Sequence, residues 1–114
     1  MPSATYKLFE KAMVERKQLL CVYDGYPREV CPIILGHRKG EEVALVYQFG
    51  GRSSRPLPPR GDWKCLTLSK ARQVQLREGP WRAGASHRQG QSCVEVVDRD
   101  VNPASPYHPR RPIA

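Results

Sequence analysis

The chain has 114 residues, of which 39% are hydrophobic, and its formal net charge is +8. This apolar content suffices for one modest core and excludes a second domain. No stretch approaches the roughly 18 apolar residues of a membrane-spanning helix, and the first residues lack a basic region followed by an apolar signal core. We therefore expect a soluble, cytoplasmic protein.

The positive charge is concentrated in the second half of the sequence. Residues 1–50 contain seven Lys or Arg and six Asp or Glu, whereas residues 51–114 contain twelve and five. A basic half of this kind favours an anionic partner, such as nucleic acid, a nucleotide or an acidic protein surface. The alternative explanation is that the positive charge only keeps the protein soluble.

The first expected element is a short amphipathic helix over residues 5–17, with Ser3 or Thr5 as its cap. Apolar side chains recur along one side at helical spacing: Leu8, Phe9, Ala12 and Met13.

Two antiparallel strands are expected next. Apolar residues alternate up to Tyr23, and the following Asp24-Gly25 favours a tight hairpin turn because Gly tolerates positive φ. Pro32 lies in the second apolar run and cannot donate to a ladder, which indicates an edge position, a bulge or a strand that starts just after it. Residues 36–42 form the next turn of the predicted hairpin.

Residues 43–49 are apolar on both faces, which is typical of a central strand. The Gly-, Pro- and Arg-rich residues 50–62 then predict an exposed loop, and loops of this length are often functional. Further strands are expected at residues 63–68, 73–78 and 93–97. We predict one domain over residues 1–98, followed by a Pro-rich, disordered basic tail over residues 99–114.

The elements together predict a mainly β (α+β) fold. A short N-terminal helix precedes a small, strongly bent antiparallel sheet or barrel of five to six strands.

The cysteines show no metal-binding spacing. The four cysteines include no Cys-x-x-Cys pair, and no His lies at zinc-finger spacing from any of them. They are Cys21, Cys31, Cys65 and Cys93. We expect all four to be buried thiols in a reducing cytosol, with a metal site as the remote alternative. No cofactor is expected.

The order of these pieces resembles the WYL domain, a bacterial regulatory module with an Sm-like small barrel. The helix leads into a strand that ends in Tyr23-Asp24-Gly25. The segment Arg28-Glu29-Val30-Cys31-Pro32, followed by Leu35-Gly36, is similar to the "r.v.P..LG" segment of the family. This is the most specific part of the resemblance, which covers residues 5–78.

The sequence departs from the family in two places. The Trp-Tyr-Leu tripeptide that names the family falls on Val43-Ala44-Leu45, so that only Leu45 is retained. Residues 62–71 resemble the segment that closes the sheet, with Lys70 where Arg is usual. The resemblance implies an Sm-like barrel that senses nucleotides or single-stranded nucleic acid in transcription regulation, here without a helix-turn-helix.

Basic and aromatic residues near the predicted loop are the candidate ligand-binding residues. Arg binds phosphate through two hydrogen bonds, and a Tyr or Trp ring can stack on a base. We expect the loop to be a basic flap over a sheet face. The candidates are Tyr23, Arg38, Tyr47, Arg52, Arg55, Trp63, Lys64 and Lys70. For Tyr47 and Trp63, a place in the core is the alternative.

Catalysis is not expected. The three histidines lie in predicted turns or the tail, and His87 near Ser86 and Ser92 is the single cluster that resembles a nucleophile with its base. The alternative to a ligand-binding module is a protein-interaction or homodimerisation module that uses the basic half or a sheet edge left open by Pro32.

Overall fold

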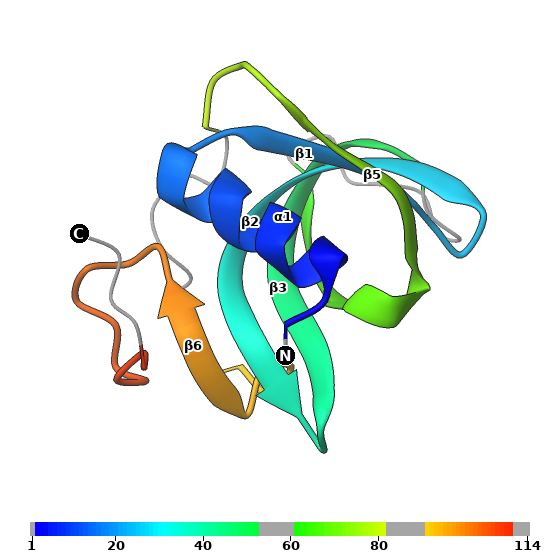
Figure 1. Cartoon of the computed structure of the whole chain (residues 1–114). Coiled ribbons are helices and arrows are strands. Elements are labelled where there is room, and N and C mark those ends of the chain that lie inside the picture. Colours follow the sequence, from blue (N-terminus) through cyan, green and yellow to red (C-terminus); the bar gives the residue numbers. More distant parts are fainter. Residues whose placement is uncertain (1, 53–60, 82–90, 111–114) are drawn as a thin grey trace.

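The described residues form one antiparallel sheet with a helix against one of its faces (Figure 1). A computed structural model describes residues 2–52, 61–81 and 91–110. Its elements are α1 (Ala4–Glu15), β1 (Gln18–Tyr23), β2 (Tyr26–Arg38), β3 (Glu41–Gly51), β4 (Asp62–Thr67), the 3-10 helix η1 (Leu68–Lys70), β5 (Ala71–Arg77) and β6 (Val96–Asp100). The predicted mainly β fold, with an N-terminal helix followed by six antiparallel strands, is confirmed.

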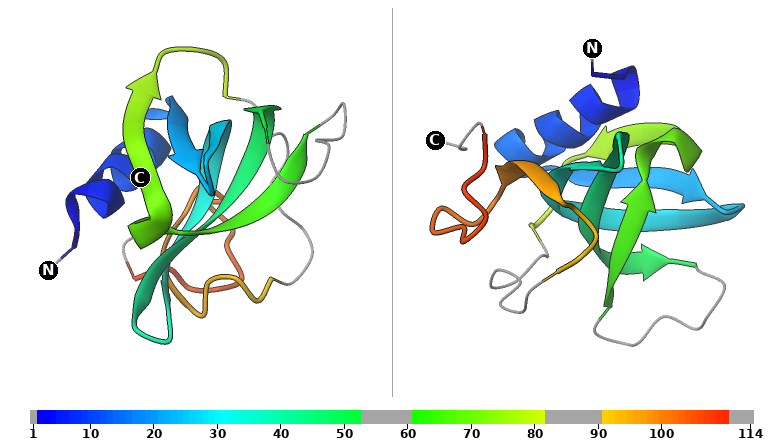
Figure 2. Two further views of the ribbon diagram at one scale, coloured as in Figure 1. Left: turned by 90° about the vertical axis from the view of Figure 1, so that its right-hand side faces the viewer. Right: turned by 90° about the horizontal axis from the view of Figure 1, so that it is seen from below.

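The strands follow the order β4-β3-β2-β1-β5, and β6 pairs with β2 outside this path. The long strands β2 and β3 curve strongly (Figure 2). The two ends of the path, β4 and β5, are joined along the chain by η1. The described residues form no ladder between β4 and β5, so the closed, Sm-like barrel stays a prediction.

Helix α1 is capped by Ser3, whose side chain accepts a hydrogen bond from the Tyr6 backbone N–H at 3.0 Å. Arg16 ends the helix in the left-handed conformation, with φ 54°. The predicted apolar stripe is confirmed except at Leu8, which is half-buried. The buried side chains are Tyr6, Phe9, Ala12 and Met13.

Two-residue turns connect the first three strands. Asp24 and Gly25 have φ of 52° and 78°, as required at a tight hairpin turn, so the predicted turn is confirmed. Lys39 and Gly40 have φ of 51° and 81° between β2 and β3. This second turn is shorter than predicted, because β2 continues to Arg38.

Pro32 lies at the point in β2 where the neighbouring strand on one side changes from β1 to β6. Residues 26–30 of β2 pair with β1, and residues 34–37 pair with β6. Opposite β3, the register shifts between Pro32 and Ile34. Because Pro has no N–H, it fits this irregular position between the two ladders. Of the three alternatives predicted for Pro32, the bulge agrees with this register shift. A strand that starts after Pro32 is wrong, because β2 begins at Tyr26, and the open sheet edge is wrong, because β6 and β3 flank β2 beyond Pro32.

Two apolar clusters lie on opposite faces of the sheet. We call the face covered by α1 the inner face and the opposite one the outer face. Along β3, Ala44 and Val46 belong to the inner cluster, and Val43 and Leu45 belong to the outer one. Since β3 is buried on both faces between β2 and β4, its prediction as a central strand is confirmed.

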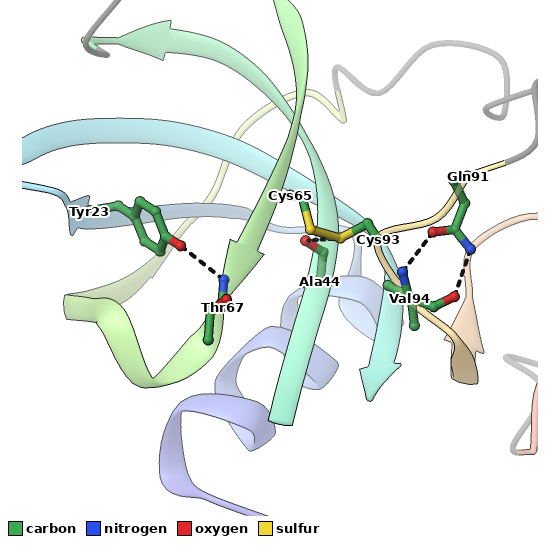
Figure 3. Close-up of a disulfide and its surroundings, with 7 residues drawn as sticks. All are labelled: Tyr23, Ala44, Cys65, Thr67, Gln91, Cys93 and Val94. Carbon is green, nitrogen blue, oxygen red and sulfur yellow. Dashed lines mark hydrogen bonds between the residues drawn. A yellow bond between two sulfur atoms is a disulfide. The ribbon is translucent and has the colours of Figure 1, made fainter. Parts of the chain in front are cut away.

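The C-terminal part differs from the sequence prediction. The Gln91 side chain bonds both the N–H and the C=O of Val94, so β6 begins at Val96 rather than at residue 93 (Figure 3). β6 then extends to Asp100, beyond the predicted domain boundary at residue 98. Tyr107 packs against the outer cluster, and the Arg110 N–H donates to the Val97 carbonyl at 3.2 Å. Residues 111–114 lie outside the described ranges.

The cysteines fall into two classes. Cys21 and Cys31 are buried thiols that take no part in a disulfide, as predicted. The prediction is wrong for Cys65 and Cys93, which form a disulfide with their Cα atoms 5.7 Å apart (Figure 3). Their 28-residue separation gave no sign of this pairing, which depends on the path that brings residue 93 back to β4. Within the described ranges, no helix has the length and apolar character needed to span a bilayer.

Candidate anion-binding site

The structure separates the sequence-predicted site residues. Arg38 and Arg52 lie near opposite ends of β3, because Arg38 pairs with Glu41 and Arg52 follows Gly51. Lys70 is exposed in η1. Arg55 lies outside the described residues. Five of the predicted residues remain near the end of the sheet where β3 ends and β4 begins: Tyr23, Tyr47, Arg52, Trp63 and Lys64.

Tyr23 is a core residue rather than an exposed stacking ring. It is 8% exposed and belongs to the inner cluster. Its hydroxyl accepts a hydrogen bond from the Thr67 backbone N–H at 3.0 Å (Figure 3). The ring therefore offers no free face to a base, but it does lie 5.3 Å from the guanidinium of Arg28.

Arg28 is the unusual residue at this end of the sheet, and the sequence prediction missed it. It is only 6% exposed. Nη1 donates to the Gln48 Oε1 and Nη2 to the Tyr23 carbonyl, both at 3.3 Å, and Nε has no hydrogen-bond partner among the described residues. No carboxylate in the described ranges forms an ion pair with Arg28, and the remaining segments contain no Asp or Glu. Arg28 is thus a buried cation among neutral oxygens.

A buried charge without a counter-ion is costly, by several kcal/mol in real proteins. The Tyr23 ring offsets part of this cost. The positive charge also acts on Cys21, which pairs with Arg28 across the β1–β2 ladder. Burial raises the pKa of the Cys21 thiol to about 11, and the charge of Arg28 opposes this shift. An anion bound beside Nε would supply the missing counter-charge.

Gln48 connects Arg28 to the end of β3. Its side chain is fully buried, accepts from Arg28, and donates to the carbonyls of Gly50 and Arg52 at 2.9 and 3.1 Å. All three of these hydrogen bonds join Gln48 to other groups of the protein, so its role is to hold Arg28 and the end of β3 in place. It fixes the backbone where the chain leaves the sheet at Arg52.

Two glycines allow the backbone to pack closely around this end. Gly51 has φ +83°, and a Cβ there would overlap the Pro27 carbonyl oxygen. Gly61 has φ +85°, and its Cβ would lie 2.8 Å from the Tyr47 hydroxyl. A larger residue at either position would therefore be both strained and crowded.

Lys64 supplies a second positive charge on the inner face. In the β3–β4 ladder Gln48 pairs with Asp62, and Lys64 lies two residues further along β4. Its Nζ is 3.5 Å from the Asp62 Oδ2, and its side chain is 24% exposed. The second cation is therefore partly neutralised already.

Tyr47 and Trp63 form an aromatic pair on the outer face. They are direct partners in the β3–β4 ladder, and their ring centroids are 5.3 Å apart in an edge-to-face arrangement. Both are half-buried against the outer cluster. The pair lies on the face opposite Gln48, so the aromatic rings and Arg28 do not share a single surface.

A second polar cluster joins α1, β2 and β6. The buried Asp98 accepts a hydrogen bond from the Tyr6 hydroxyl at 2.5 Å and lies 3.2 Å from His37 Nδ1. Tyr6 and His37 stack at 5.9 Å. His87, the histidine of the sequence-predicted cluster, lies outside the described residues. In the described part of the chain, no group of three or more His, Cys, Asp or Glu could hold a metal ion.

Comparison with known proteins gives no match. No family model, no curated protein and no solved structure is significantly similar to the chain. The resemblance to the WYL domain therefore stays a prediction.

Proposed function

We propose that the protein is a non-catalytic, regulatory ligand-binding module that binds a nucleotide or single-stranded nucleic acid through its phosphates. The observation that carries this proposal is the buried Arg28, which has neither a carboxylate partner nor an acceptor for its Nε within residues 2–52, 61–81 and 91–110. Arg is the side chain best suited to phosphate, because its planar fork donates two parallel hydrogen bonds.

Other features support an anionic ligand at this end of the sheet. Arg52 is exposed one residue after β3, and Lys64 lies on the same face as Gln48. Residues 51–114 carry most of the positive charge. The resemblance to the WYL domain supports a role in bacterial transcription regulation. The cytoplasmic location expected from the sequence belongs to the same proposal.

Fluorescence titration with a short single-stranded oligonucleotide tests the proposal, with Trp63 and Trp81 as reporters. We expect saturable binding whose affinity falls as salt rises, because phosphate contacts release counterions. The double variant Arg52→Ala and Lys64→Ala should bind more weakly. The control Lys7→Ala and Lys11→Ala removes the same charge from the exposed side of α1 and should bind like the wild type. Absence of oligonucleotide binding at low salt would refute the nucleic-acid half of the proposal, and absence of mononucleotide binding as well would refute the whole proposal.

The alternative is a protein-interaction or homodimerisation module without a nucleic-acid ligand. Among the described strands, β4, β5 and β6 are each paired on one side only, so their unpaired edges could add a strand from a partner. Light scattering after size-exclusion chromatography separates this alternative from the first. A stable dimer that does not bind the oligonucleotide would favour it.

A further inference from the structure

The burial of Arg28 limits the shape of any anion that can reach it. The residue is 6% exposed and contacts side chain or backbone of both β1 and β3. A phosphodiester inside a strand carries a nucleoside on each side, which keeps it away from a deeply placed guanidinium. A terminal phosphate has a single ester bond and can extend beyond its sugar. The depth of Arg28 therefore favours a terminal phosphate over an internal one.

The unbonded Nε identifies the side of the guanidinium that lacks a hydrogen-bond acceptor among the described residues, although this nitrogen is itself enclosed by the fold. Nη1 and Nη2 each donate to a neutral oxygen at 3.3 Å, and Nε donates to none. An Nε–H and the Nη2–H beside it point in parallel and can bind two oxygens of one phosphate. The long contacts to neutral oxygens are weaker than charge-assisted bonds to phosphate. The available edge of Arg28 thus matches a bidentate oxyanion.

The charge of the neighbouring groups favours a doubly charged ligand. A phosphate monoester carries about −1.5 to −2 at pH 7, whereas a diester carries about half of that. Within the described residues Arg28 has no counter-ion. Lys64 lies on the same face as Asp62, two residues further along β4, and its charge is partly neutralised by the Asp62 carboxylate. The oxygens of Asp62 are engaged by Lys64 and by the Trp63 backbone N–H, which lessens their repulsion of an anion.

We infer that Arg28 is the receptor for a terminal phosphate monoester, carried either by the end of a single-stranded nucleic acid or by a mononucleotide. Nε and Nη2 bind two phosphate oxygens. This inference rests on the proposed function and names the chemical group that is recognised.

The first experiment compares two oligonucleotides of identical sequence, one with a 5′-phosphate and one with a 5′-hydroxyl, by fluorescence anisotropy. The same comparison is made for a 3′-phosphate. Wild type should bind one phosphorylated form roughly tenfold or more tightly, the effect of a charge-assisted hydrogen bond. Arg28→Met should lose this preference and bind the hydroxyl form as wild type does. The control Arg72→Met, which removes an exposed Arg from β5, should keep the preference.

The second experiment distinguishes the two sources of the phosphate and needs no variant. Adenosine monophosphate, adenosine and inorganic phosphate are added to the wild-type protein, and the Arg Nε–H resonances are followed by NMR. We expect the Arg28 Nε–H signal to shift with the two phosphates and not with adenosine. If adenosine monophosphate saturates the shift at a lower concentration than inorganic phosphate, the nucleoside contributes to binding and the mononucleotide is the ligand. Equal affinities for the two phosphates would show that the nucleoside adds nothing and would favour the oligonucleotide end.

The outcomes separate this inference from the proposed function. Salt-sensitive oligonucleotide binding without any end preference, or a preference that survives in Arg28→Met, would overturn the inference and leave the function standing. If no oligonucleotide binds, the nucleic-acid half of the proposed function fails, and the NMR titration then decides whether Arg28 receives the phosphate of a mononucleotide. An Arg28 signal that does not respond to either phosphate would overturn the inference.

Discussion

Cys65 and Cys93 join β4 to the segment that precedes β6, and they lie at very different depths. Cys65 is exposed, whereas Cys93 is 6% exposed within the outer cluster. The bond therefore connects the surface of one strand to the residues that cover the outer face. Its exposed end is open to reducing agents, although its other end lies in the core.

We predict that removal of this disulfide lowers stability by about 3 to 4 kcal/mol, the chain-entropy value for a loop of this length. Thermal unfolding with and without dithiothreitol measures the effect. The double variant Cys65→Ser and Cys93→Ser should unfold at a lower temperature and no longer respond to dithiothreitol. Equal melting temperatures for the oxidised and reduced wild type would contradict the prediction. In a reducing cytoplasm, the reduced form is the one expected.

Cys21 should be unreactive in the folded protein. Burial raises the pKa of its thiol to about 11, so only about one part in a thousand is thiolate at pH 8. Alkylation by iodoacetamide, followed by mass spectrometry, should be slow at pH 8 and accelerate toward pH 11. Because the folded pKa lies above the ordinary value of 9.0, the stability that the protonated thiol contributes is lost as pH rises from 9 to 11. Rapid labelling at pH 8 without unfolding would refute this.

Tyr6→Phe should destabilise the fold by about 1 to 3 kcal/mol. The change removes the hydroxyl that donates to Asp98, whose side chain is 7% exposed, and so leaves a buried carboxylate with one donor fewer. Urea unfolding at pH 7 provides the measurement. Tyr26→Phe, at a half-buried position next to the β1–β2 turn, is the matched control and should change little. The prediction fails if the two variants are equally stable.

Gly51→Ala should be more damaging than Gly40→Ala. Both glycines have positive φ, so each alanine incurs a backbone cost of about 1 kcal/mol. At Gly40 no atom lies within 4 Å of the new Cβ, whereas at Gly51 the Cβ would overlap the Pro27 carbonyl oxygen. Chemical denaturation should therefore separate the two variants by more than about 1 kcal/mol. Similar unfolding midpoints would show that the β2–β3 contact yields easily.

Arg28→Met should leave the ligand-free protein as stable as the wild type or more stable. The substitution replaces an unpaired buried charge with an apolar side chain of similar length, and such changes are often neutral or stabilising by about 1 to 4 kcal/mol. Urea unfolding in phosphate-free buffer measures this effect. A strong loss of stability would mean that the contacts with Gln48 and Tyr23 outweigh the cost of burying the charge.

Local sequence signals predicted the fold well. The hairpin at Asp24-Gly25 and the N-terminal helix depend on neighbouring residues. The hairpin forms as predicted, and the helix forms with Ser3 as its cap rather than Thr5, the other predicted candidate. Pro32 indicated an irregular position but could not reveal that β6 returns to pair beyond it. That pairing joins residues about sixty positions apart, and no local pattern encodes it.

The candidate site was harder to predict, because charged residues are expected at the surface. Arg28 precedes Val30 by two positions, so strand alternation places both on one face, and Val30 is fully buried. This alternation was the available signal. The prediction instead selected Tyr23 for its ring and the loop arginines for their charge. The distance between Arg38 and Arg52 along β3 could not be judged before the register of the hairpin was known.

Strand β2 pairs first with β1 and then with β6 along the same side, and this arrangement affects how the protein could self-associate. If β6 came away from the sheet, residues 34–37 of β2 would expose unpaired N–H and C=O groups between two apolar clusters. Such an edge is a template for strands from other molecules and a starting point for aggregation. The disulfide at Cys93 holds the chain three residues before β6 begins, and so limits how far β6 can move away. While the bond is oxidised, it therefore also protects this edge in concentrated solution.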